Sequence, residues 1–332
     1  MNWLRYVFVL ALSATTLASF PAAANTTCWV EATALNFNSA NPSGATTATI
    51  SYECLTFSQT GDEVAVAMCL AIGPGSPPGT VLERQMSNAF ADPLPFQIYK
   101  DPSHNQVWGD SPAPPSHLEH HVPPYTVTNF LGFGVGYTRG EVNVYGELSL
   151  LPDTAAGDYR SSLNARMTYS YRESKNNPNA PKCDQGNNST TEVFQFEAIR
   201  TVRPSCTVVT ASDMNFSPGG MPLSGTRTGD LTSTSTIDLT CTKRTAWQVG
   251  LDDGQNPVGG ARQMCNSGGA CIAYQLNQPD GATPWGDELD VDTVDGISVG
   301  TQQTLTVNGR VNDQPLTQAG RYSDTVKVIL TY

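Results

Sequence analysis

The stretch "TTCWVEATALNF" (26–37) returns in altered form as "PSCTVVTASDMNF" (204–216). Each version carries a cysteine near its start and ends in Asn-Phe. Three further blocks of sequence also occur twice, in the same order along the chain. Chance similarity could explain one matched block but hardly an ordered set of four, so the sequence indicates two copies of one domain.

The three other blocks carry further strands and turns of each copy. Their residues alternate between apolar and polar types, with Gly, Pro and Asn between the runs, which predicts about six short β-strands in each copy. This pattern fits an all-β fold of two immunoglobulin-like β-sandwich domains. The matched pairs are "ATISYEC" (48–54) with "STIDLTC" (235–241), the Trp-Gly-Asp-ending segments 94–110 and 272–287, and the segments 144–171 and 307–332.

Composition supports this fold class and excludes some partners. The chain of 332 residues has 29 Gly and 23 Pro, and few runs with helical amphipathicity. Its formal net charge of −12 argues against nucleic acid or an anionic membrane as a partner.

The first 24 residues have the layout of a secretory signal peptide. Arg5 precedes a short apolar stretch, and Ala22-Ala23-Ala24 ends the segment. We therefore expect an exported protein with a signal peptide at 1–24, an N-terminal domain at 25–200 and a C-terminal domain at 201–332.

The eight cysteines form an even set, which in an exported chain predicts disulfides. The repeat pairs Cys28 with Cys54, and Cys206 with Cys241 in the second copy. Cys265 and Cys271 flank the short loop "NSGGA" and should form a local bridge. Cys69 and Cys183 then pair by elimination.

The ordered features of each copy resemble the spore coat protein U domain family, which includes subunits of archaic chaperone–usher pili of the Csu type. The resemblance rests on the Cys-bearing first strand with Asn-Phe, the strand ending in Cys, Trp-Gly-Asp, and G-x-Y before a final alternating strand. It covers both copies and is looser in the first, which carries insertions. It implies pilin domains that lack a seventh strand, which a periplasmic chaperone and then the next pilus subunit supply. It also implies an outer-membrane usher as a partner, and a chain of this length resembles a tip adhesin.

The end of the second copy fits that expectation. From Tyr322 onward, alternate positions form a strand pattern that stops at Tyr332. An unpaired strand exposes backbone donors and acceptors, so we expect a groove that receives a strand from another chain. Its candidate residues are Tyr322, Val326, Val328, Leu330 and Tyr332.

The beginning of the mature chain suggests a position in the fibre. Only "NTT" (25–27) lies between the expected cleavage site and Cys28. A shaft subunit needs a free donor segment about one strand long. We therefore expect this chain to accept a strand without donating one, at the pilus tip.

The first copy continues beyond its matched final strand into "STTEVFQFEAIRTV" (189–202). Phe194, Phe196 and Ala198 alternate with other residues there, which predicts that residues 191–200 complete the sheet of this domain. The alternative is an extended linker with incidental aromatic residues.

Insertions in the first copy are the candidate binding regions. The largest, at 111–140, contains apolar residues among prolines and glycines, and segments 71–82 and 87–96 are further candidates. Csu-type tip adhesins attach to abiotic surfaces through hydrophobic loops, so the resemblance implies attachment to an abiotic or host surface and biofilm formation. Some of these residues could instead face the core. The surface-binding candidates are Tyr125, Val127, Phe130, Leu131, Phe133, Val135 and Tyr137.

Other functions have weaker support. The run "HLEHH" (117–121) contains metal-ligand residue types, but it lies among prolines with one other histidine, His104, in the chain, so a solvated loop is preferred. No catalytic motif with defined spacing is present. We therefore expect no enzyme activity, cofactor or metal. A lectin-like tip that binds a glycan or protein, and a structural coat or pilus subunit without a receptor, remain the alternatives.

Overall fold

The computed structural model describes residues 25–39, 44–149, 153–176, 178–179, 181–185, 190–217 and 222–332. The expected signal peptide, 1–24, lies outside these ranges. In the part of the chain that is described, no helix has the length and apolarity needed to cross a membrane.

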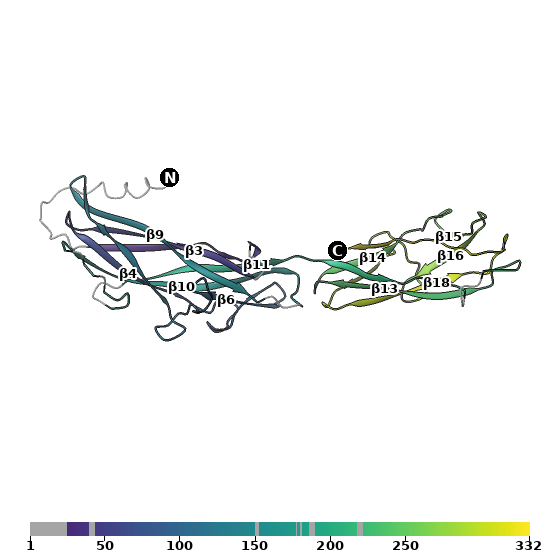
Figure 1. Ribbon diagram of the computed structural model, residues 1–332, viewed down its shortest axis with the longest axis horizontal. Helices are drawn as coiled ribbons and strands as arrows, with labels where there is room; N and C mark the ends of the chain where they lie inside the picture. The colour runs from purple at the N-terminus through teal and green to yellow at the C-terminus, as the bar shows by residue number, and fades with distance from the viewer. Residues whose placement is uncertain are drawn as a thin grey trace.

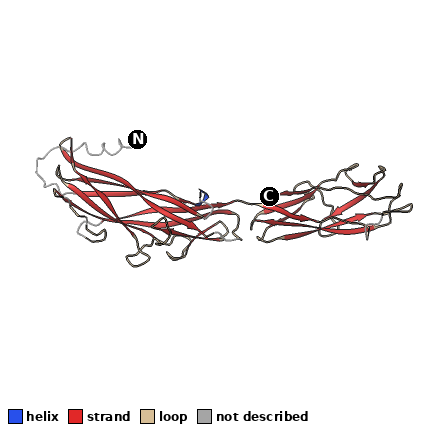
Figure 2. Ribbon diagram, in the orientation of Figure 1, coloured by secondary structure: helices blue, strands red, loops and turns tan. Residues whose placement is uncertain are grey.

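Nearly all regular structure is β, and the strands form two sandwiches, which confirms the predicted fold class (Figure 2). The first sandwich contains β1 (Asn25–Ala32), β2 (Leu35–Asn36), the 3₁₀ turn η3 (Phe37–Ser39), β3 (Ala45–Phe57), β4 (Glu63–Ile72), β5 (Arg84–Ser87), β6 (Pro93–Tyr99), β7 (Leu118–Thr126), β8 (Thr128–Phe130), β9 (Phe133–Leu148), β10 (Gly157–Ser174) and β11 (Thr190–Val202). The second contains β12 (Cys206–Ala211), β13 (Leu231–Cys241), β14 (Ala246–Leu251), β15 (Arg262–Cys265), β16 (Cys271–Asn277), β17 (Val294–Ile297), β18 (Gln303–Val311) and β19 (Val328–Thr331).

The two sandwiches repeat one strand order. One layer runs β1-β3-β9-β6-β5 in the first sandwich and β12-β13-β18-β16-β15 in the second. The facing layer runs β7-β4-β10-β11 in the first and β17-β14-β19 in the second. The predicted repeat is therefore a repeat of architecture. Among the described residues, β2, β8 and β11 of the first sandwich have no counterpart in the second, and β11 is the long strand of the three.

The strands outnumber the prediction of about six in each copy. The additional strands include β2, β5, β8, β15 and β17, which are two to four residues long. Segments of this length show too little alternation to be recognised from sequence.

Each sandwich has its own hydrophobic core, built around a tryptophan and an arginine. Trp108 and Trp285 from the two Trp-Gly-Asp sequences are 0% exposed, and their indole N–H groups donate to Leu70 O and Val249 O. The buried Arg84 donates to the backbone carbonyls of Ile72, Gly73 and Trp108. The second copy repeats this arrangement with Arg262, which donates to the carbonyls of Leu251, Asp252 and Trp285.

All four expected disulfides are present in the structure. Cys28–Cys54 and Cys206–Cys241 link directly opposed residues of the first two long strands in each copy. Cys265–Cys271 closes the β15–β16 hairpin, and Cys69–Cys183 joins β4 to the segment after β10.

The sandwiches lie end to end, with the C-terminus near their junction (Figure 1). Arg244 pairs with Asp92 of the first sandwich and stacks over the Phe90 ring, 4.6 Å from its centroid. Lys243 accepts a backbone hydrogen bond from Ala156 N–H at 2.8 Å. Segment 87–96, a candidate binding loop from sequence, therefore contacts the second sandwich at the junction.

Replacing Arg84 by Met should lower the free energy of unfolding of the first sandwich by roughly 3 kcal/mol, because several buried carbonyls lose their donor. Chemical denaturation of the chain with intact disulfides measures this loss. Arg160→Met removes an exposed guanidinium from β10 and is the matched control. Equal stability of the two variants would contradict a structural role for the buried arginine.

The junction should loosen in acid. Hydrogen bonds from Arg244 and Asn88, with the nearby charge of Lys243, hold the pKa of Asp92 below its ordinary value despite the opposing effect of burial. A lowered folded pKa gives a contribution that is present above the ordinary pKa and lost as pH falls through the folded value. Small-angle scattering should therefore show a more variable angle between the sandwiches below about pH 4.

Asp92→Asn should give the loosened arrangement already at pH 7, with little further change in acid. An identical acid response in the variant and the unaltered chain would assign the effect to other carboxylates.

Candidate functional site

A groove with a volume of about 640 Å³ runs along the second sandwich. Its two rims are the segment that continues from β12, residues 211–217, and the segment that leads into β19, residues 320–326. Its floor is apolar and includes Met264, Ile272 and Leu276.

The burial of one strand face distinguishes the two copies. In β10, the inward-facing side chains Tyr159, Ser161, Leu163, Ala165 and Met167 are each at most 1% exposed. Their counterparts in the repeat, Tyr322, Asp324, Val326, Val328 and Leu330, are all only half-buried.

Strand β11 causes this difference. It pairs antiparallel with β10 from Gly157↔Val202 to Tyr169↔Thr190 and adds a short parallel pairing to β2. Phe194, Phe196 and Ala198 are 8%, 1% and 0% exposed, so the side chains of β11 fill the core. The prediction that residues 191–200 complete the first sheet is confirmed, and the linker alternative is excluded.

The opposite rim shows the same contrast. Leu35 and Phe37 are each 0% exposed in the first sandwich, whereas their counterparts Met214 and Phe216 are half-buried. Within the described residues, β19 pairs with β14 and lies at the edge of its sheet. The groove thus occupies the place in the second sandwich that β11 fills in the first.

The predicted groove residues divide into two sets. Tyr322, Val326 and Val328 line the groove. Leu330 packs against the core but is not among the lining residues, and Tyr332 is 59% exposed at the end of the chain.

The groove also contains a polar pair that the sequence interpretation did not single out. Tyr274 O–H donates to Asp324 Oδ2 at 2.6 Å, and Gln255 N–H donates to Asp324 Oδ1 at 2.9 Å. Burial, together with the hydrogen bond to Asp324, raises the pKa of Tyr274. In the sequence, Asp324 shares the alternate positions of the inward-facing apolar residues, and this position could have identified it as a groove residue.

A hairpin in the first sandwich exposes a cluster of large apolar side chains. Phe130 and Phe133 are directly paired, and Leu131 and Gly132 between them have φ of 53° and 90°, as a type I′ turn requires. Exposed fractions are 49% for Phe130, 84% for Leu131 and 69% for Phe133. Phe57, 47% exposed and opposite Val135, joins them. We call Phe57, Phe130, Leu131 and Phe133 the hairpin patch.

The β8–β9 hairpin, which carries most of the hairpin patch, lies at the end of the first sandwich that faces away from the junction (Figure 1). Strand β10 starts beside the junction at Gly157 and runs to Ser174, which pairs with Glu63 at the opposite end. Its length of 18 residues corresponds to a separation of roughly 55 Å.

The other surface-binding candidates occupy different environments. Tyr137 is 50% exposed and Val135 is half-buried. Val127 is 1% exposed, and its backbone bonds Asp62 and Gly61, so it is a core residue. Tyr125 packs against the same core, and its hydroxyl bonds Thr56 Oγ1 at 2.7 Å. Burial raises the pKa of Tyr125 to about 12.

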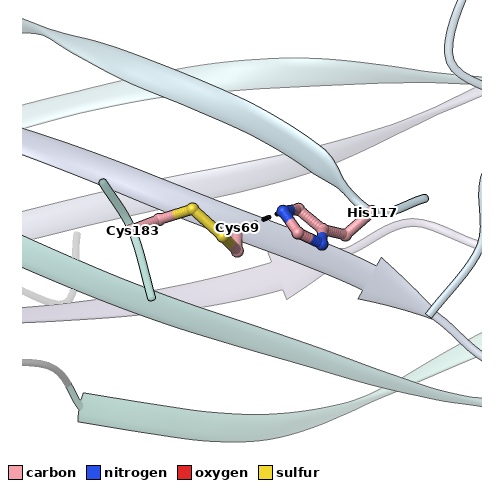
Figure 3. A group of neighbouring side chains, drawn as sticks. All are labelled: Cys69, His117 and Cys183. Atoms are coloured by element: carbon pink, nitrogen blue, oxygen red, sulfur yellow. Dashed lines mark hydrogen bonds between the residues drawn. A yellow bond between two sulfur atoms is a disulfide. The ribbon is translucent and has the colours of Figure 1, made fainter. Parts of the chain in front are cut away.

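Cys69, Cys183 and His117 form the single cluster of potential metal ligands in the described part of the chain (Figure 3). His117 Nε2 lies 3.1 Å from Cys69 Sγ. The disulfide occupies both sulfur atoms, so the oxidised chain offers one imidazole here and no thiolate. His120 of the same "HLEHH" run packs against the Tyr52 ring, and burial lowers its pKa.

The family model of the Spore Coat Protein U domain matches residues 12–166 and 191–329. No curated protein matches the chain. Among solved structures, the chain is similar to the CsuC–CsuE chaperone–tip adhesion subunit pre-assembly complex of Acinetobacter baumannii, with 16% identity, a TM-score of 0.41, and coverage of 83% of this chain and 87% of that one. It is also similar to the CupB6 tip adhesin of Pseudomonas aeruginosa, with 13% identity, a TM-score of 0.34, and coverage of 92% and 94%.

The buried face of β11 should stabilise the first sandwich. Phe196→Ala removes a side chain that is 1% exposed, so it should lower the free energy of unfolding by about 3–5 kcal/mol. The neighbouring Gln195 points outward, and Gln195→Ala should change it by less than about 0.5 kcal/mol. Chemical denaturation of the full chain compares them, and similar losses would mean that β11 does not complete this core.

Proposed function

The chain belongs to the Spore Coat Protein U domain family, and on that premise we propose that it is the tip adhesin of a chaperone–usher pilus. One observation carries the proposal: the same strand face is fully covered by β11 in the first sandwich and half-buried along a groove in the second. The second sandwich is then a pilin domain that needs a strand from another protein. The first supplies its own strand and is free to bind a surface.

The groove suits donor-strand complementation. An added strand would pair with the outer edge of β19 and cover the apolar floor, as β11 does beside β10. Two or three large apolar side chains buried there would contribute on the order of 5 kcal/mol, and the backbone hydrogen bonds would add to this. In the proposed assembly, a periplasmic chaperone fills the groove first, and the next pilus subunit replaces it at the usher.

The hairpin patch supports adhesion by the first sandwich. Apolar side chains gathered at one exposed end mark an interaction site rather than ordinary surface. Their proposed target is an apolar abiotic or host surface, where burial of Phe130, Leu131 and Phe133 drives attachment and biofilm formation.

The proposed division of the chain follows these roles. Residues 25–200 form the adhesin domain and residues 201–332 the pilin domain. Strand β11 extends to Val202 and β12 begins at Cys206, which supports residues 203–205 as the proposed linker. The expected signal peptide would direct the chain through the periplasm to the cell surface.

Substitution of the hairpin patch should weaken attachment. Leu131→Asp combined with Phe133→Asp should reduce binding of piliated cells to polystyrene by about tenfold, because charged groups resist removal from water. Val193→Asp alters another exposed apolar residue, 67% accessible on β11, and should bind normally. Attachment that survives the double substitution but is abolished by a free sugar would instead support a lectin-like tip.

A charge in the groove should block assembly. Val326→Asp places a carboxylate in the groove, where an incoming strand would bury it at a cost of several kcal/mol. The chain should no longer copurify with its periplasmic chaperone. Thr331 lies close by in the sequence, is exposed and does not line the groove, and Thr331→Asp should copurify normally. Equal recovery of chaperone with both variants would contradict strand acceptance at this groove.

A further inference from the structure

The first sandwich provides a register for the strand that would enter the second. Along β10, Leu163 lies opposite Phe196, Ala165 opposite Phe194 and Ser161 opposite Ala198. The repeat aligns these three β10 residues with Val326, Val328 and Asp324. An incoming strand that runs antiparallel to β19, as β11 runs to β10, would therefore meet Val328, Val326 and Asp324 in turn.

The two sandwiches differ in chemistry at the third of these positions, which Ser161 occupies in the first and Asp324 in the second. In the first sandwich, Ser161 and Ala198 are 1% and 0% exposed, and the counterpart of Tyr274 in the repeat is the buried Phe96. In the second, Asp324 replaces the serine, and Tyr274 takes the place of Phe96 and donates to the carboxylate. A hydrogen-bonded pair of Tyr274 and Asp324 thus lies in this groove, beside the apolar floor residues; Asp213 and Arg321 on the rims are the other charged lining residues.

The surrounding backbone limits how far this carboxylate can move away. Gly254 lies so close behind it that a Cβ there would be 2.0 Å from Asp324 Oδ2. Gln255 N–H and Tyr274 O–H hold one oxygen each. A residue facing Asp324 therefore meets a group that is larger than Ser161, negatively charged and held in place.

We propose that the groove selects a partner strand with a small, uncharged side chain against Asp324 and bulky apolar side chains against Val326 and Val328. This inference rests on the proposed strand acceptance and adds the chemistry of the partner. Read from its N-terminus, the strand would have two bulky apolar residues and then a small one at alternate positions, as Phe194, Phe196 and Ala198 do in β11. A bulky residue at the third position would clash, and an acidic one would face a like charge.

Synthetic peptides with the β11 sequence, residues 190–202, can test this selection on the full-length chain. Fluorescence anisotropy measures the Kd of the peptide and of its Ala198→Leu, Ala198→Asn and Ala198→Asp forms. We expect the Leu form to bind at least about tenfold more weakly than the Ala form. We expect the Asp form to bind at least about tenfold more weakly than the isosteric Asn form.

A chain with Asp324→Asn isolates the charge effect. In that chain, the Asp and Asn peptides should bind with similar Kd, which closes a double-mutant cycle. Similar Kd values for the Asp and Asn peptides on the unaltered chain would overturn the inference, whether or not the variant folds.

The remaining outcomes separate the inference from the proposed function. If no peptide binds, strand acceptance itself fails. If all four bind equally well, strand acceptance stands and the selection by Asp324 is wrong. A chain that forms dimers by exchanging its own β11, seen by size-exclusion chromatography, would replace the separate partner with a second copy.

Discussion

The outer backbone edge of one strand governs the difference between the two halves of this chain. A strand in a sandwich must pair its N–H and C=O groups and bury its inward side chains, and a neighbour on that edge does both. β11 is that neighbour in the first sandwich, where it hydrogen-bonds along β10 and inserts two phenylalanines into the core. In the second sandwich, the equivalent face borders a groove. Two copies of one architecture therefore differ in whether this face is covered by the chain's own strand.

The features that sequence predicted well depend on local pattern or on the repeat. Period-two alternation identified β11, because Phe194, Phe196 and Ala198 all face the core. The repeat paired the cysteines of β1 with β3 and of β12 with β13. Alternation reports which residues share a face but not what covers that face. Val127 and Leu131 are both apolar residues of the same insertion, yet Val127, which joins β7 to β8, is buried, whereas Leu131 lies exposed in a turn.

Long-range packing accounts for most of what sequence reasoning missed. Arg84 is a charged residue in a turn-rich region, so its sequence context does not predict burial. It is buried because it donates to the carbonyls of Ile72 and Trp108, which the fold brings together. Phe57 gains its place in the hairpin patch through pairing with Val135, far away in the chain. The segment that contains Phe90 and Asp92 is predicted from sequence to be a binding loop. Its contact residue, Arg244, belongs to the other copy, and the sequence of the first copy alone does not reveal that contact.

The direct passage from β11 into β12 has a mechanical consequence. Val202 ends one strand and Cys206 begins the next, so a pull between the hairpin patch and the second sandwich enters the first sandwich along the axis of β11. Hydrogen bonds between antiparallel strands lie across that axis and are strained together in shear, rather than opened one after another. The Cys206–Cys241 bridge then transfers the tension covalently from β12 to β13. In the proposed adhesin, the strand that closes the first core would thus also be the tether through which an attached cell is held against flow.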